Sequence, residues 1–247
     1  MLRSDFGTTT VLNTSTISPA TARLYGLEPN TLVEIFSPYH SQETRFQLEA
    51  NTALAFEAMA AKAAQDGIHL AICSAYRPFE RQLAIWNAKA SGKRVVLDAF
   101  EQQIDIKGLT DNQLVDLILL WSALPGASRH HWGTDIDVFD ASQIDAKALR
   151  LIEVEYIEGG PCAKLHSWLK DNAHDFGFYF PFQRGQSAVS PEPWHISYFP
   201  VSQLLLPQFD THELAILLKN SDMLLKDAVL SRLSTLVDEY VLRIAKP

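Results

Sequence analysis

The order in which helical and extended patterns follow one another most constrains how this chain can fold. Apolar residues recur at helical spacing, or helix start and stop signals occur, in residues 44–67, 77–92, 110–124 and 161–178, and in the tail from Thr211, with one break near Asn220 and Ser221. Short extended runs occupy residues 68–76, 134–140 and 194–199. These runs do not alternate regularly with helices. The pattern therefore predicts an α+β fold, with a small antiparallel sheet packed on one side by helices.

Composition and charge argue against several classes of protein. The 247 residues are enough to bury a large core, and they carry a formal net charge of -8. An acidic chain is a poor partner for nucleic acid or for an anionic membrane surface, because both would repel it. Cys73 and Cys162 lack the spacing of a zinc knuckle, and nothing requires them to form a disulfide.

The chain has neither the pattern of a membrane span nor that of a secretory signal. Its longest apolar run, LVDLILLWSAL, is too short to cross a bilayer, and its opening stretch, MLRSDFGTTTVLNTSTIS, has no apolar core. We therefore expect no membrane insertion. The sequence as it stands predicts a cytoplasmic protein, or a periplasmic one if the chain is trimmed or exported by another route.

The stretch SRHHWGTDIDV, residues 128–138, combines two histidines and two aspartates around one glycine. Successive side chains alternate along a strand, so Asp135 and Asp137 are expected to share one face. Gly133 permits a turn that could bring His130 back over Asp137. Taken alone, the stretch is equally typical of a loop that enters a half-buried strand with a solvent-facing polar side.

A second stretch, SPEPWHISYF at residues 190–199, contains the other unusual group of residues. Glu192 lies between two prolines, which restrict the backbone and hold the carboxylate on a stiff loop just before His195. A carboxylate fixed in this way suits a general base. The plain alternative is a surface loop followed by a strand in which His195 makes a structural hydrogen bond.

The two stretches together supply the parts of a hydrolytic zinc site. Two imidazole nitrogens and one carboxylate oxygen, from His130, Asp137 and His195, form a three-ligand zinc set with a fourth position for water. Glu192 beside that water would complete a metallohydrolase site. This is not the H-E-x-x-H pattern on one helix, because the base precedes the last ligand and the ligands come from two segments.

These residues carry a resemblance to a known family. SRHHWGTDID resembles the S-x-H-x-x-G-x-x-x-D motif of the D-alanyl-D-alanine carboxypeptidases (VanY-like, M15B), and EPWH resembles their E-x-W-H motif. SAYRPFERQ, residues 74–82, resembles their S-x-Y-R-x-x-x-x-Q motif, and all three occur in the family's order. The resemblance implies the α+β zinc-peptidase fold shared with lysostaphin-type enzymes and the hedgehog domain. On this basis residues 45–200 are expected to form the peptidase domain, 1–44 an irregular segment and 201–247 a helical extension packed on it.

The resemblance also implies roles for individual residues. These roles are zinc ligands for His130, Asp137 and His195, the general base for Glu192, the substrate-holding arginine for Arg77, and polar pocket positions for Ser128 and Gln82. Two alternatives stay open. Asp135 stands where many members carry a small residue, so it adds charge near the metal or accepts a hydrogen bond behind it. His131 competes with His130, although the spacing favours His130.

The implied activity is a zinc carboxypeptidase, with one zinc per chain, that removes a C-terminal D-alanine from peptidoglycan peptides. The motifs do not indicate whether the residue before that alanine is D-alanine or a residue with an L-configured centre, so D,D- and L,D-carboxypeptidase activity both stay open. Alternatives are a peptidoglycan cross-bridge endopeptidase, a non-catalytic zinc-binding domain of the hedgehog type, and a metal-free protein with coincidental motifs. Glu192 argues against the hedgehog type, because a structural metal site does not need a base.

Overall fold

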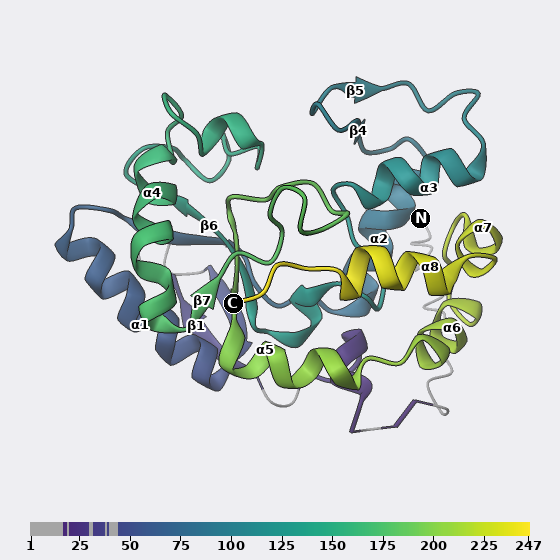
Figure 1. Cartoon of the computed structure of the whole chain (residues 1–247), viewed down its shortest axis with the longest axis horizontal. Helices are drawn as coiled ribbons and strands as arrows, with labels where there is room; N and C mark the ends of the chain where they lie inside the picture. The colour runs from purple at the N-terminus through teal and green to yellow at the C-terminus, as the bar shows by residue number, and fades with distance from the viewer. Residues whose placement is uncertain (1–16, 19, 30–31, 38, 40–43) are drawn as a thin grey trace, which may run out of the picture.

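A four-stranded antiparallel sheet lies at the centre of the computed structural model, which describes residues 17–18, 20–29, 32–37, 39 and 44–247 (Figure 1). In spatial order its strands are β3 (Leu70–Ser74), β6 (Asp135–Asp140), β8 (His195–Tyr198) and β7 (Phe178–Tyr179). Every pair of neighbours runs antiparallel. The α+β class with a small antiparallel sheet is therefore confirmed.

Two helices cover one face of this sheet. They are α1 (Ala50–Gln65) and α4 (Ala163–Asn172), followed by the 3-10 turn η4 (Ala173–Phe176). The sheet residues that pack with them alternate along the strands, as Ile136 and Val138 do on β6. Asp135 and Asp137 therefore point to the opposite face. All six residues of β6 are nevertheless buried, so that face is not the solvent-facing side that the polar pattern also allowed.

The remaining helices form a second apolar cluster beside the sheet. Its members include residues of η1 (Ala22–Tyr25), α2 (Phe79–Ala90), α3 (Asp111–Leu119), α5 (Phe199–Leu205), α6 (Thr211–Lys219), α7 (Lys226–Leu230), α8 (Leu233–Val237) and the π-helix η6 (Asp238–Leu242). A short turn, η5 (Leu206–Gln208), links α5 to α6. At the start of α3, Thr110 and Gln113 form the capping box that their spacing predicts. Figure 1 shows this group on the opposite side of the sheet from α1 and α4.

Two separate hairpins flank the main body. One pairs β1 (Leu32–Phe36) with β2 (Arg45–Glu49), and the other pairs β4 (Val96–Leu97) with β5 (Gln103–Ile104). The helix predicted from residue 44 is wrong in its first turn, because Arg45–Glu49 is extended and pairs with β1. Helix α1 begins only after Glu49, whose side chain caps it by accepting from the Thr52 backbone N–H.

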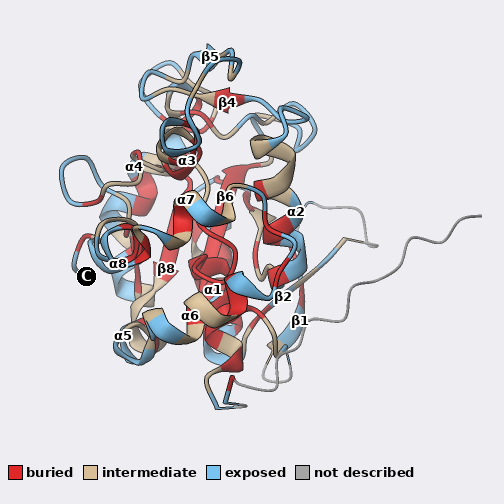
Figure 2. Ribbon diagram, turned by 90° about the vertical axis from the view of Figure 1, so that its right-hand side faces the viewer, coloured by how far each residue is buried: buried red, intermediate tan, exposed pale blue. Residues whose placement is uncertain are grey.

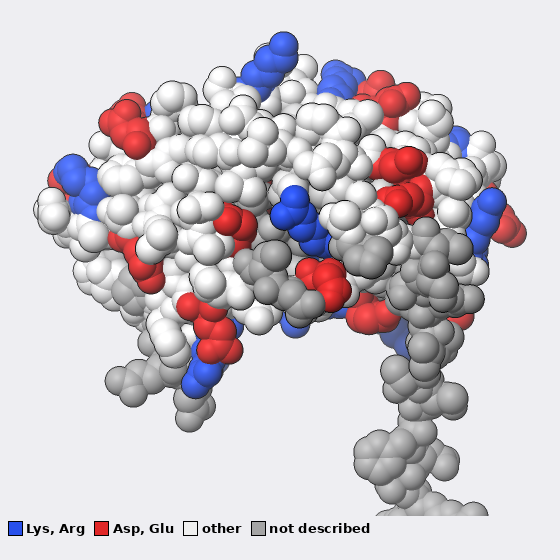
Figure 3. Space-filling view, turned by 90° about the horizontal axis from the view of Figure 1, so that it is seen from below, with Lys and Arg blue, Asp and Glu red and all other residues white. Residues whose placement is uncertain are grey.

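The outer surface of the molecule is mixed in charge. Figure 2 shows the buried core along β6 and β8, and at one end the β4–β5 hairpin, in which Val96 is buried and the neighbouring residues are intermediate or exposed. On the face in Figure 3, acidic and basic side chains are interspersed. Among the described residues, no helix combines the length and apolarity that a membrane crossing requires. Two further 3-10 turns, η2 (Arg129–Trp132) and η3 (Glu153–Glu155), lie before and after β6.

Candidate metal centre and active site

The pairing of the strands sets three side chains in one row across the sheet. Ser74 of β3 lies opposite Asp137 of β6, and Asp137 lies opposite His195 of β8. The register between β3 and β6 shifts between Ile72 and Ser74, which brings Ser74 into the row. Directly opposed residues of antiparallel strands present their side chains on the same face. The sheet therefore brings together residues that are 121 positions apart, between Ser74 and His195.

His130 joins this row from η2, the turn that precedes β6. Its Nε2 lies 3.3 Å from Asp137 Oδ2, while His195 Nδ1 lies 3.1 Å from Asp137 Oδ1. Each of His130, Asp137 and His195 is buried and offers one ligand atom, and the three atoms lie within 4.8 Å of one another. The structure thus brings together the three residues that were predicted to bind zinc.

The turn before β6 depends on a glycine. Gly133 has a φ of 71°, in the left-handed region that glycine adopts without strain. A Cβ at this position would lie 2.6 Å from Leu32 Cδ2 and 2.9 Å from the Glu49 nitrogen. The Gly133 carbonyl accepts a hydrogen bond from that same Glu49 nitrogen. The glycine therefore lets η2 pass close to the β1–β2 hairpin on its way into β6.

The ring of His130 is oriented by a backbone carbonyl. Its Nδ1 lies 2.9 Å from the Ala75 oxygen, so Nδ1 carries the proton and donates it. The lone pair of a neutral ring is then on Nε2, the nitrogen that faces Asp137. Burial lowers the pKa of His130, which favours this neutral form.

The ring of His195 is oriented by Asp135. Its Nε2 lies 2.9 Å from Asp135 Oδ1, and its Nδ1 faces Asp137. A hydrogen bond to a carboxylate at one ring nitrogen fixes the tautomer, and it leaves the other nitrogen free to bind a metal. Asp135 therefore lies behind His195. Of the two roles that the sequence left open for Asp135, this is the hydrogen-bond acceptor and not only an added charge.

Asp135 is held by a network that is wholly buried. Its carboxylate accepts hydrogen bonds from Arg129 Nε at 2.7 Å, Thr134 Oγ1 at 2.6 Å and Ser197 Oγ at 3.1 Å. Arg129 also donates to Ser197 and stacks over the ring of Trp132. Sequence reasoning missed Arg129 because its partners come from two strands, and no local spacing pairs them.

The charges around His195 oppose the cost of burial. Burial alone would raise the pKa of both Asp135 and Asp137. Arg129 and His195 instead hold the pKa of Asp135 well below its usual range. His130 and His195 do the same for Asp137. Burial also disfavours a charged His195, yet the hydrogen bond between its Nε2 and Asp135 and the negative charges of Asp135 and Asp137 raise its pKa to about 10. Two buried carboxylates around one imidazole form a site that favours a cation.

Asp137 fits the role of a metal ligand on its own atoms. Its Oδ1 is buried and has no hydrogen-bond partner, since the 3.1 Å approach of His195 Nδ1 lacks hydrogen-bond geometry. A buried carboxylate oxygen without a donor is costly unless a cation binds it. Together with one imidazole nitrogen from each of His130 and His195, this oxygen matches the donor set that zinc prefers.

Glu192 lies beside this cluster. Its Oε2 is 3.4 Å from His195 Nδ1, and its carbonyl accepts from the His195 N–H, which closes the turn into β8. The Glu192 N–H is itself bonded to the Phe182 carbonyl. Burial, aided by Asp137, raises the pKa of Glu192 to about 7, although His195 opposes the shift. A carboxylate with that pKa can both accept and release a proton near neutral pH.

Arg77 is held in place by two side chains of its own motif. Its Nη1 donates to Gln82 Oε1 at 2.8 Å, and its Nη2 donates to Ser74 Oγ at 2.9 Å. Gln82 is buried and donates in turn to the Ala123 carbonyl. Gln82 therefore contacts Arg77, and Ser74, which sequence reasoning did not single out, supports the same guanidinium from the sheet.

His131 and Ser128 flank His130 in the sequence, and the structure places them differently. The ring of His131 points away from the cluster, with Nδ1 against the Arg77 carbonyl and Nε2 accepting from the Gly126 N–H. Burial lowers the pKa of His131 to about 3, so it is neutral. Ser128 is buried at the start of η2 and lines the same cleft as His130.

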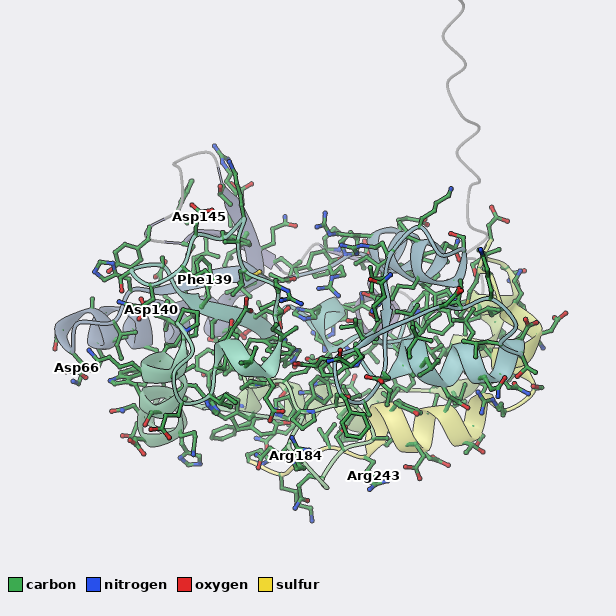
Figure 4. The ribbon with its side chains drawn as sticks, turned by 90° about the horizontal axis from the view of Figure 1, so that it is seen from above. Asp66, Phe139, Asp140, Asp145, Arg184 and Arg243 are labelled. Atoms are coloured by element: carbon green, nitrogen blue, oxygen red, sulfur yellow. The ribbon has the colours of Figure 1, made fainter. Side chains whose placement is uncertain are left out.

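A cleft of about 610 Å³ opens over these residues. It is lined by the ligand cluster, by Glu192, Arg77 and Ser128, and by the stacked rings of Trp121 and Trp194. Asp140 lies at the end of β6 that is far from Asp135. In Figure 4 it is on the same side of the molecule as Asp66, the residue after α1, while Arg184 and Arg243 lie along another edge. The cleft thus lies on the face of the sheet that α1 and α4 leave open.

Comparison with known proteins agrees with this arrangement. A protein of Haemophilus influenzae, described as uncharacterized, is 38% identical over 121 residues, which are 48% of this chain and 92% of that protein. The D-alanyl-D-alanine carboxypeptidase of Enterococcus faecalis is 28% identical over 136 residues, 54% of this chain but only 41% of the relative's length.

Similarity extends to the fold. The solved structure of the L,D-carboxypeptidase LdcB superimposes with a TM-score of 0.52 at 22% identity, and the match covers 81% of this chain and 78% of that one. The family model for VanY, D-alanyl-D-alanine carboxypeptidase, matches residues 45–201, which include every residue of the site described above. The chain therefore belongs to the VanY D-alanyl-D-alanine carboxypeptidase family.

Proposed function

We propose that this protein is a zinc-dependent carboxypeptidase that removes a C-terminal D-alanine from peptidoglycan peptides, with a D- or an L-configured residue before it. The observation that carries the proposal is the convergence of His130, Asp137 and His195 on one buried point, with Glu192 beside it. The activities of two similar proteins, a D-alanyl-D-alanine carboxypeptidase and an L,D-carboxypeptidase that recognises peptidoglycan, support both the bond and the substrate.

His130 Nε2, Asp137 and His195 Nδ1 would hold the zinc ion. A bound zinc would supply Lewis acidity and a lower pKa for the attacking water. Glu192 accepts a proton from that water as the water oxygen attacks the scissile carbonyl carbon. Glu192 then delivers the same proton to the alanine nitrogen as the carbon–nitrogen bond breaks. The products are a free alanine and a peptide shortened by one residue.

Arg77 gives the site its preference for the end of a peptide. Arg77 is half-buried, and its guanidinium is held by Gln82 and Ser74. A planar guanidinium can bind a terminal carboxylate with two parallel hydrogen bonds. Ser128 lines the same cleft and is proposed to contact that end of the substrate.

The test is a pair of peptides that end in D-alanine, one as the free acid and one as the amide. The wild-type protein should cleave the acid at least about tenfold better in kcat/KM, because a charge-assisted hydrogen bond of about 1.5–3 kcal/mol is lost with the amide. Arg77→Lys should lose most of this preference. Equal cleavage of acid and amide by the wild type would identify an endopeptidase instead.

Glu192→Gln provides the second arm of the experiment. Its zinc content should equal that of the wild type, while kcat falls by about 10²–10⁴-fold, the usual contribution of a positioned acid–base group. A variant that retains zinc and near-normal kcat would refute the proton transfer described above. Loss of zinc would make Glu192 a ligand. Matched peptides with D-alanine or an L-residue before the scissile bond decide between D,D- and L,D-activity.

A further inference from the structure

Four basic side chains of the cleft have no role in the chemistry described so far. Besides Arg77 and Arg129, the cleft is lined by Lys89, Lys93, Arg94 and Arg150. Among the described residues, none of these four side chains makes an ion pair or a hydrogen bond. Elsewhere several exposed basic residues are paired with carboxylates, as Arg45 is with Glu34. A group of unpaired cations is unexpected in a chain whose net charge is -8.

The helix α2 places this group next to the reaction centre. Ile85 and Lys89 are four residues apart, so they lie on one face of α2, and both line the cleft. Gln82, which holds Arg77, lies one turn earlier on the same face. Lys93 and Arg94 follow directly after the helix, and Arg150 enters from the loop beyond β6. Three of the four basic residues therefore lie on or directly after α2, the helix whose Gln82 holds Arg77.

Lys89 is the member whose surroundings most favour an anionic partner. It is half-buried, and burial together with the charge of Arg94 lowers the pKa of its ammonium to about 8. Glu192 and Arg77 are the other charged groups that act on it, so it lies within electrostatic range of the reaction centre. A desolvated cation without a counter-ion is unfavourable, and an anionic ligand would relieve that cost.

We propose that Lys89, Lys93, Arg94 and Arg150 form a second anion subsite, which binds a side-chain carboxylate on the acyl side of the scissile bond. This rests on the proposed function, in which Arg77 takes the terminal carboxylate and the leaving residue is an alanine. The leaving residue then offers only a methyl side chain, so any further carboxylate belongs to the acyl side. The preferred substrate is therefore an acidic peptide, distinguished from neutral peptides with the same C-terminus.

The experiment uses two peptides that share a C-terminal D-alanine and differ only in one acyl-side residue, an acid or its side-chain amide. Wild type should cleave the acidic peptide at least about tenfold better in kcat/KM. Lys89→Gln and Arg94→Gln should each reduce this ratio, and the double variant should reduce it further than either single change. Lys170→Gln, an exposed lysine of α4 away from the cleft, should leave the ratio unchanged.

Three results separate the subsite from the proposed activity. A wild type that cleaves both peptides equally overturns the subsite alone. Lys89→Gln could instead lose the preference for a terminal acid over a terminal amide while keeping the acyl-side preference. That result would assign the cations to the terminal carboxylate, and it would also overturn the subsite. Should neither peptide be cleaved, binding of both to the Glu192→Gln variant still decides. Tighter binding of the acidic peptide, lost with Lys89→Gln, supports the subsite, and equal binding overturns it.

Discussion

Asp135 determines which nitrogen of His195 faces the metal position. It lies two residues from Asp137 on the same face of β6, yet the two carboxylates contact opposite ring nitrogens of one histidine. Asp137 offers an oxygen without a hydrogen-bond donor, whereas Asp135 has donors on both oxygens. The two aspartates occupy equivalent positions in the strand pattern. Their different hydrogen-bond partners make Asp137 the candidate metal ligand and Asp135 the residue that holds His195.

We predict that Asp135→Asn weakens zinc binding by about 10–100-fold, the usual effect of removing the group that orients a ligand histidine. The amide keeps an acceptor but loses the charge that balances Arg129 and His195. Zinc affinity is measured by competition with a chelator, on protein whose circular dichroism shows it folded. Asp140→Asn is the matched control, because Asp140 is a buried residue of the same strand outside the site. An unchanged affinity in Asp135→Asn would contradict this role.

Residue spacing predicted part of this site and could not predict the rest. His130 is the histidine that faces Asp137, as the motif spacing indicates, and His131 is used to hold the Arg77 carbonyl. The support of Asp135 by Arg129 and Ser197 depends on strand pairing. No periodicity within one segment contains that information, because β6 and β8 are about sixty residues apart in the sequence.

At the scale of elements, the turn between η2 and β6 is where local conformation and long-range packing meet. Gly133 needs a positive φ, and it also needs the space that a Cβ would take from Leu32 and from the Glu49 backbone. Both requirements serve one purpose, because His130 precedes the turn and Asp137 follows it. Their separation therefore depends on this single backbone geometry.

Gly133→Ala should lower the free energy of unfolding by more than Gly108→Ala does, although both substitutions place an alanine at a left-handed backbone position. Gly108 is the control, since its φ of 84° is also left-handed but nothing lies within 4 Å of the place that a Cβ would take. Both variants incur about 1–2 kcal/mol for the left-handed conformation. Gly133→Ala should lose a further amount of about 1–3 kcal/mol through overpacking. Denaturant unfolding measures both, and equal losses would show that the close approach is relieved without cost.

Sequence patterns recovered the elements that are long or fully buried and missed those defined by their partners. β3, β6 and β8 lie within the predicted extended runs, and α2 and α3 lie within the predicted helices. Arg45–Glu49 was assigned to a helix because it adjoins the strong helical pattern of α1, whereas its pairing with β1 makes it a strand. The two-residue strand β7 and the short helix α5 contain too few residues to show a period.

At the scale of the whole molecule, the cleft takes its residues from several elements. Strands β6 and β8, whose other face packs in the cluster of α1 and α4, carry Asp137 and His195, while α2, which packs in the cluster of the C-terminal helices, carries Lys89. Tyr240 of η6 also lines the cleft, so the C-terminal tail contributes to the same surface. In the proposed function, the sheet and η2 thus supply the residues for catalysis, while α2 and the residues that follow it supply much of the substrate selection.

The charge of the whole molecule and the charge of the cleft act in opposite directions on an acidic substrate. The net charge of -8 repels an anionic peptide, while the unpaired basic residues of the cleft attract it. Burial and the charge of Arg94 lower the pKa of Lys89 to about 8. Its ammonium is charged below that pH and neutral above it, whereas an arginine guanidinium stays charged in proteins. Raising the pH therefore weakens the local attraction without reducing the repulsion from the body.

We predict that the preference for the acidic peptide over its acyl-side amide is constant below about pH 7 and falls as the pH passes through the pKa of Lys89. A ratio of kcat/KM values is measured, because the titration of Glu192 and of other groups that serve both peptides cancels in it. Lys89→Arg should extend the preference to higher pH, since a guanidinium stays protonated there. A residual preference should persist in the wild type because the subsite also contains arginines, and guanidinium groups are effectively always protonated. A ratio that does not change with pH in the wild type, or that falls equally in Lys89→Arg, would show that Lys89 does not carry the charge recognised by the substrate.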